Sequence, residues 1–173
     1  MDASEVLTDA ARRPIDSAER ALRGISRETL HASPGGRGSS IAWLIWHAAR
    51  QMDAQVAHLA GTDQVWSRDD WGARLGIPRG PKEIGFGDTP EVVASLVVDD
   101  PGLLLDYLRA AVDDLVSHLG TWSASDLDVV IDTRWDPPVT RGVRLVSVID
   151  DAVAHVGQAA YARGVVEGWS IGY

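Results

Sequence analysis

Cysteine is absent from the 173-residue chain, which excludes disulfides, thiolate nucleophiles and cysteine-based zinc or iron–sulfur sites. Positive charge is scarce, because 16 basic residues stand against 25 acidic ones and give a formal net charge of -9. This balance argues against nucleic acid as a partner. Lysine occurs only at Lys82, and phenylalanine only at Phe86.

Long apolar runs are also missing. No stretch approaches 18 uninterrupted apolar residues, so we expect no membrane-spanning segment. Residues 1–5 lack the basic and apolar pattern of a signal peptide. Hydrophobic residues make up 45% of the chain and charged residues 24%, which is typical of globular proteins. We therefore expect one soluble domain over residues 1–173 with a cytoplasmic location.

Helical periodicity dominates the sequence. Four segments carry apolar residues at helical spacing: 2–30, 40–60, 101–119 and 145–167. Pro14 lies inside the first segment, where it predicts a kink or a division. Ser40 and Gly61 suit the two ends of the second segment. Four helices of this length, joined by loops, predict an all-α four-helix bundle.

The connections between these helices are irregular. Residues 61–89 are rich in Gly and Pro, and a connection of this length is usually functional or covers another part of the molecule. Thr89 and Pro90 open a short helix, and residues 97–98 suggest an extended segment. Residues 127–139 contain β-branched residues and a double proline, which predict a short β excursion before the last helix.

Five histidines are the first candidates for chemistry. His31 falls in a loop, and His58 and His118 fall in the last turns of their helices, where a protonated imidazole is favoured by the helix dipole. His47 and His155 differ, because each lies in the middle of a helix beside the apolar stripe. These two are the histidines that we single out.

His155 follows Asp151 by four residues, so both side chains lie on one helix face. A carboxylate and an imidazole at this spacing form half of a catalytic zinc site, which one further His and open water positions would complete. His47 is the natural third ligand. The alternative is a structural Asp–His pair, which the spacing alone favours.

Tryptophan is the second unusual feature, with seven copies in the chain. Trp43 and Trp46 bracket the approach to His47, and four others lie in the irregular connections: Trp66, Trp71, Trp122 and Trp135. Their role is either to anchor loops on a small bundle or to form an apolar mouth over a polar pocket.

Two stretches carry a family resemblance: Ser40-Ile-Ala-Trp-Leu-Ile-Trp-His47-Ala-Ala-Arg50 and Val148-Ile-Asp-Asp151-Ala-Val-Ala-His155-Val-Gly-Gln158-Ala-Ala-Tyr161-Ala-Arg163-Gly164. Both resemble the DinB-like superfamily of metal-binding four-helix bundles. That superfamily includes YfiT-type thiol transferases and mycothiol-dependent maleylpyruvate isomerase. The connecting residues 134–145 are similar to an actinobacterial subgroup, and the run His155-Val-Gly-Gln158 is the most specific part.

The resemblance implies a metal centre made of His47, Asp151 and His155. The usual member has His at the position of Asp151, whereas the maleylpyruvate isomerase branch has Glu there. That branch also has an Asp six residues after its His, as Asp53 stands here. The implied cofactor is a divalent metal ion, for which we expect zinc, with nickel as the alternative.

The resemblance also implies a thiol transferase or isomerase. Because the chain has no cysteine, the thiol must be external, such as mycothiol, and its partner a small electrophile. Trp43 and Arg50, one turn either side of His47, and Gln158 are the candidate substrate contacts. Two alternatives stay open: a non-catalytic metal- or ligand-binding dimeric bundle, and a metal-dependent hydrolase that uses a metal-activated water. Exposed apolar helix faces would suit a homodimer.

Overall fold

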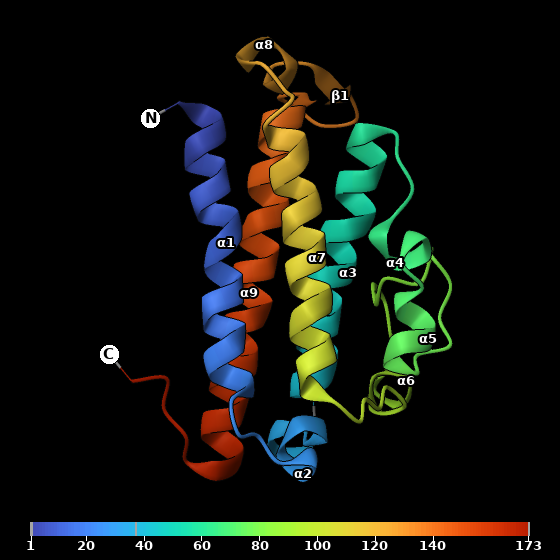
Figure 1. Ribbon diagram of the computed structural model, residues 1–173, viewed down its shortest axis with the longest axis vertical. Coiled ribbons are helices and arrows are strands. Elements are labelled where there is room, and N and C mark those ends of the chain that lie inside the picture. Colours follow the sequence, from blue (N-terminus) through green and yellow to red (C-terminus); the bar gives the residue numbers. More distant parts are fainter. Residues whose placement is uncertain (1, 37, 173) are drawn as a thin grey trace.

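The computed structural model describes residues 2–36 and 38–172 of the chain. Four long helices form a bundle: α1 (Ala3–Leu22), α3 (Ile41–Ala60), α7 (Pro101–Leu119) and α9 (Arg141–Glu167). Helices α1 and α9 run in one direction, and α3 and α7 run in the opposite one (Figure 1). Both α1 and α3 pack against α7 and α9, so α1 and α3 lie diagonally across the bundle. The predicted all-α four-helix bundle is confirmed.

Side-chain caps fix the ends of the helices. Ser40 accepts a hydrogen bond from the backbone N–H of Trp43, and Gly61 ends α3 in the left-handed conformation, as predicted. Thr140 caps α9, so this helix begins at Arg141, four residues before the predicted start. Pro14 lies inside α1 and does not divide it.

The first helix ends earlier than predicted. Arg23 is extended and Gly24 has a φ of 66°, so the chain leaves the helix after Leu22 instead of continuing to residue 30. A second, five-residue helix, α2 (Arg27–His31), follows and is capped by Ser26.

Short elements fill the connections: η1 (Pro34–Gly36), α4 (Val65–Arg68), α5 (Trp71–Leu75), α6 (Pro90–Ala94) and α8 (Ala124–Leu127). The predicted β excursion is confirmed as an antiparallel pair, β1 (Val130–Asp132) and β2 (Val139–Thr140). Residues 97–98, where the sequence suggests an extended segment, form no strand. In the part of the chain that the structure describes, the sheet consists of β1 and β2. Among these residues, no helix has the length and hydropathy needed to span a bilayer.

Burial differs between the two helices that carry the candidate ligands. On α9 the predicted stripe is fully buried: Val148, Ala152, Val156 and Ala159. On α3, however, every residue from 41 to 53 is buried, because α7, α9 and the connection through α4 pack around it. That connection returns alongside α3 and α7 (Figure 1). Polar residues in the first half of α3 are therefore enclosed by protein.

Two tryptophans of the connection fasten it to the bundle. The rings of Trp66 and Trp71 each lie 5.3 Å from the ring of Tyr107 on α7, and Trp66 also meets Trp46 edge-on at 6.3 Å. Trp135, by contrast, is mostly exposed in the β excursion. The loop-anchoring interpretation therefore describes the buried tryptophans Trp66 and Trp71.

Candidate metal centre

The structure brings His47, Asp151 and His155 together where α3 and α9 pack side by side. One ligand atom from each residue lies within 4.8 Å of the others. The two imidazole rings are 4.7 Å apart and nearly perpendicular, and Nε2 of His155 lies 3.5 Å from a carboxylate oxygen of Asp151. The spacing of four residues on α9 produces this pairing, because it puts both side chains on one face.

Hydrogen bonds at Nδ1 orient both imidazoles. Nδ1 of His47 lies 2.5 Å from the carbonyl oxygen of Ile84, and Nδ1 of His155 lies 2.9 Å from Oε1 of Gln158. Both oxygens are acceptors, so Nδ1 carries a proton in each imidazole, and Nε2 is the nitrogen that remains for a metal ion. Zinc-ligating histidines are typically fixed by an outer hydrogen bond of this kind.

The donor set therefore fits a divalent cation of the zinc type. Two imidazole nitrogens and one carboxylate oxygen are the ligands that catalytic zinc sites use, and three protein ligands leave a coordination position for water or substrate. Within residues 2–36 and 38–172, no other group of three His, Asp or Glu side chains meets in this way.

The two histidines titrate differently. Burial lowers the pKa of His47, although the hydrogen bond to Ile84 partly opposes this effect. Asp151 raises the pKa of His155, first through its hydrogen bond and then through its charge. Burial thus favours the neutral form of His47, whereas the carboxylate of Asp151 stabilises the protonated form of His155.

One side of His47 is closed by protein. The ring of Trp43 stacks on the imidazole at 4.6 Å, and its indole N–H donates to Asp88 over 2.9 Å. Arg79 donates to the same carboxylate over 2.6 Å. Burial alone would raise the pKa of Asp88, but the hydrogen bonds from Arg79 and Trp43 outweigh it and hold that pKa below its usual value. These contacts fix residues 79–88, here called the strap, over the metal-centre end of α3.

Gly85 allows the strap to approach so closely. It has a φ of 96°, and a Cβ at this position would lie 2.7 Å from Nδ1 of His47 and 3.0 Å from the ring of Trp43. A residue with a side chain would therefore be strained and would collide with the imidazole. The next residue of the strap, Phe86, has 92% of its surface exposed.

The other side of the cluster is open to solvent. His47 is 8% exposed, whereas the side chains of Asp151 and His155 are 42% and 18% exposed. Solvent therefore reaches the cluster from the side of α9.

A family model described as mycothiol-S-transferase matches residues 6–168. The chain belongs to this family. The family is DinB-like, so the resemblance seen in the sequence is confirmed.

One solved structure, a conserved protein from Enterococcus faecalis, is similar over almost the whole chain. It is 36% identical, the match covers 98% of this chain and 99% of that chain, and the TM-score is 0.90. No curated protein matches the sequence.

In this mycothiol-S-transferase family member, two of the three predicted substrate contacts touch the cluster. Trp43 stacks on His47, and Gln158 accepts the hydrogen bond of His155. Both side chains therefore position a predicted metal ligand, whether or not they also touch substrate.

Arg50, the third predicted contact, is not brought to the cluster. Its side chain is 0% exposed, and its guanidinium donates to Asp53, Tyr107, Gln64 and the carbonyl oxygen of Pro81. Enclosed in this way, Arg50 holds the connection against α3 and α7, so its burial does not support a contact with substrate.

Asp53 completes the same buried cluster. Its carboxylate accepts hydrogen bonds from the backbone N–H groups of Val65 and Trp66, each over 2.8 Å, and from the hydroxyl of Tyr107 over 2.7 Å. Asp53 thereby holds the first turn of α4. Sequence reasoning missed this role and also missed Ile84, because a backbone carbonyl leaves no signature in residue type.

Proposed function

We propose that this protein is a metal-dependent thiol S-transferase that joins a low-molecular-weight thiol of the mycothiol type to a small electrophile. Membership of the mycothiol-S-transferase family supports the thiol and the reaction class. The observation that carries the metal is the convergence of His47, Asp151 and His155, with both imidazoles fixed at Nδ1. Zinc is the ion that this donor set suits best, with nickel as the alternative.

When bound, a divalent ion lowers the pKa of a thiol or water that it coordinates. His47 and His155 would hold the ion through Nε2, and the carboxylate of Asp151 would offset part of its charge. The thiol sulfur then forms the new bond to the electrophilic carbon, the leaving group departs with the bonding electrons, and the thiol proton passes to solvent. The chain has no cysteine, so both reacting groups come from outside.

The surroundings of the cluster suit this reaction. Trp43 and the strap exclude water from one side of His47, while the exposed side of Asp151 admits the reactants. Gln158 binds Nδ1 of His155 and so leaves Nε2 as the nitrogen for the metal ion. Phe86 follows Gly85 in the strap, and its exposed ring would offer apolar surface to an electrophile.

An assay with mycothiol and monobromobimane, an alkylating electrophile that becomes fluorescent on reaction with thiols, tests the proposal. We expect metal-loaded wild type to form the thioether faster than the uncatalysed reaction, and His155→Ala to lose this acceleration. Cysteine in place of mycothiol tests whether the thiol is recognised. Metal-dependent hydrolysis of a p-nitrophenyl ester without thiol turnover would assign the centre to a hydrolase. Metal binding with neither activity would favour a binding module.

A further inference from the structure

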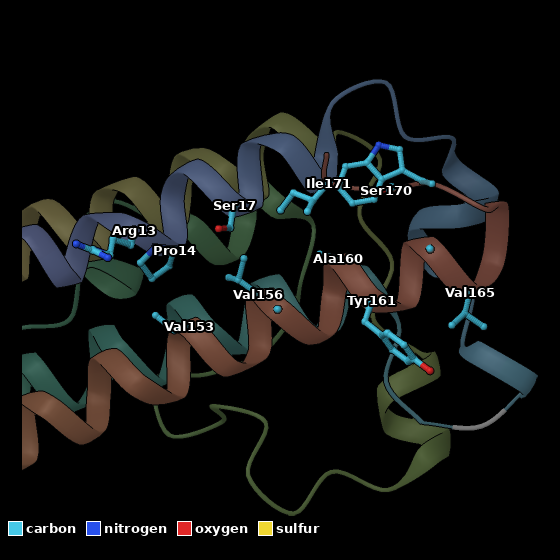
Figure 2. A pocket seen from close by; sticks show the side chains of 13 residues that line it. Arg13, Pro14, Ser17, Val153, Val156, Ala160, Tyr161, Val165, Ser170 and Ile171 are labelled. Atoms are coloured by element: carbon cyan, nitrogen blue, oxygen red, sulfur yellow. The ribbon is translucent and has the colours of Figure 1, made fainter. Parts of the chain in front are cut away.

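Helix α9 has two sides that differ in chemistry. The side next to α1 carries a cavity of about 580 Å³, and Figure 2 shows apolar residues of α9 such as Val153 and Val156 along it. None of the three candidate metal ligands lines this cavity. The side next to α3 carries Asp151 and His155, so the reactants of the proposed reaction would lie on that side.

Polar residues form a row along α9 on the side of the candidate ligands. With about 100° of rotation per residue, five of them lie within about 80° of each other on the helix: Arg144, Ser147, Asp151, His155 and Gln158. Helix α3 carries a second row within about the same angle: His47, Gln51, Gln55 and His58. We call these two sets the polar rows. Each row continues beyond the candidate metal ligands that it contains.

Contacts between the helices place the polar rows side by side. His47 meets the two candidate ligands of α9, and the side-chain N–H of Gln51 donates to the carbonyl oxygen of Val148 over 3.0 Å. The two helices run in opposite directions (Figure 1), so one turn further along α3 corresponds to one turn back along α9. Gln55 is therefore level with Arg144. Together the polar rows form one strip, which runs from the candidate metal centre toward the beginning of α9.

Arg144, at the far end of this strip, has N–H donors that no protein group uses. Its guanidinium lies 3.7 Å from a carboxylate oxygen of Asp132 on β1, and its side chain is 27% exposed. Within residues 2–36 and 38–172 it makes no hydrogen bond. Asp132 instead accepts its hydrogen bonds from Arg134. Arg144 therefore offers donors to a ligand, beside a carboxylate that balances its charge.

We propose that the strip binds the hydroxyl-rich body of the thiol, with Arg144 as the far anchor. This inference rests on the proposed function, which puts the thiol sulfur at the metal centre. Seven residues separate Arg144 from Asp151, about 10 Å along the helix axis, so a thiol whose body consists of two rings spans the distance. Amide, hydroxyl and guanidinium groups are suitable hydrogen-bond partners for hydroxyls. Mycothiol, which carries a sugar and an inositol, has such a body.

Charge favours a neutral body over one rich in carboxylates. Arg144 already pairs with Asp132, and Asp150, which directly precedes Asp151, is exposed. The chain as a whole carries a net charge of -9. A thiol such as glutathione, with two carboxylates, would bring further negative charge close to these aspartates. The strip therefore predicts discrimination against glutathione.

Binding of a probe without sulfur tests the strip independently of the thiol chemistry. The probe is N-acetylglucosaminyl inositol, a neutral pair of rings, titrated into zinc-reconstituted protein by isothermal titration calorimetry. We expect wild type to bind this probe. Arg144→Met should bind it about tenfold more weakly, because hydrogen bonds from a charged group are lost.

A matched pair of variants on one turn of α9 keeps the test independent of Arg144. Ser147 is exposed one turn before Asp151, so the ring of Ser147→Phe would cover the strip. Val146 is 57% exposed and lies outside both polar rows. We expect Ser147→Phe to weaken binding of the probe about tenfold and Val146→Phe to leave its Kd unchanged, with the same circular dichroism and zinc content in both variants.

Kinetics with two thiols connect the strip to the reaction. Cysteine lacks the pair of rings, so the ratio of kcat/KM for mycothiol to that for cysteine should fall about tenfold in Arg144→Met and stay at the wild-type value in Val146→Phe. Wild type that binds the probe but forms no thioether contradicts the proposed function and supports the strip. Wild type that does not bind the probe overturns the strip whatever the thiol chemistry. The strip is also overturned if Arg144→Met and Ser147→Phe both bind the probe as wild type does, or if glutathione reacts with the KM of mycothiol.

Discussion

Two polar clusters include residues of α3 that lie within two turns of each other, and they differ in how far they are enclosed by protein. In the closed cluster, Arg50 and Asp53 are 0% exposed, and the carboxylate accepts four hydrogen bonds from protein donors. In the candidate metal cluster, the imidazoles make their hydrogen bonds at Nδ1, to Ile84 and Gln158, and one ligand atom of each histidine lies within 4.8 Å of Asp151.

This difference separates architecture from chemistry. The closed cluster is shut off from solvent, and its carboxylate and guanidinium bind α4, α7 and the connection, so this cluster fastens the connection to the bundle. In the candidate metal cluster, hydrogen bonds at Nδ1 fix both imidazoles, and the side chains of Asp151 and His155 are partly exposed to solvent. A set of metal ligands needs this arrangement. Each cluster can be broken by substitutions that leave the other one intact.

The largest effect is expected in the closed cluster. Asp53→Ala leaves the guanidinium of Arg50 buried without its carboxylate and frees the N–H groups that begin α4, so the free energy of unfolding should fall by about 3–5 kcal/mol. Urea denaturation of metal-free protein measures this change. His155→Ala, at the more exposed cluster, should cost less than about 1 kcal/mol in the same experiment. An equal fall in the free energy of unfolding in Asp53→Ala and His155→Ala would contradict the distinction between the two clusters.

The next effect concerns the strap over His47. Gly85→Ala should weaken metal binding about 10- to 100-fold, because the added methyl collides with Nδ1 and displaces the hydrogen bond to Ile84. Isothermal titration with zinc measures the affinity. Gly87→Ala is the matched control: its φ of 79° is also positive, but a Cβ there meets no described atom within 4 Å. It should cost about 1–2 kcal/mol of stability and leave the affinity unchanged. Identical affinities in the two variants would contradict the role of the strap.

A smaller effect is expected at the outer hydrogen bond of His155. Gln158→Leu removes the acceptor that fixes the tautomer, so zinc affinity should fall about tenfold while the fold is kept. Gln55→Leu is the control, since that side chain donates to Gln51 and not to a predicted ligand. If Gln158→Leu binds zinc as wild type does, the outer hydrogen bond does not tune the centre.

The smallest effect is pH-dependent. Because the pKa of Asp88 is lower in the folded protein, its contribution to stability is complete above about pH 4 and is lost as the pH falls through the folded pKa. Asp88→Asn should therefore cost about 1 kcal/mol at pH 6, and the difference from wild type should shrink as the pH falls through the lowered pKa of Asp88. Chemical denaturation at several pH values, on metal-free protein, checks this. A difference that stays constant down to pH 2 would exclude the ionised pair with Arg79.

The convergence of the three candidate ligands could be predicted from the sequence, because it depends on residue types and on their positions along the helices. Asp151 and His155 share a helix face at four residues, and His47 was the other histidine in the middle of a helix. For Arg50, the same reasoning predicts a contact with substrate from its place one turn after His47, but it does not predict the burial that the structure shows. Its burial follows from the connection wrapped around α3, which periodicity within one helix does not reveal.

The long helices could be predicted for a similar reason: Ser40 and Gly61 carry their capping signals in the residue type. The first helix was predicted too long, since Gly24 was passed over as its end. Helices α4 and α5 are four and five residues long, too short for a periodic pattern to emerge. They are held by tertiary contacts, such as the hydrogen bonds from Asp53, and these appear only when distant segments meet.

Bound metal in wild type and in His155→Ala tests the account most directly. Elemental analysis of tag-free protein, purified and then reconstituted with zinc or nickel, should find about one equivalent per chain in wild type and none in the variant. Wild type without metal after reconstitution, or a variant that retains the full equivalent, would contradict the metal centre and leave Asp151 and His155 as a structural pair.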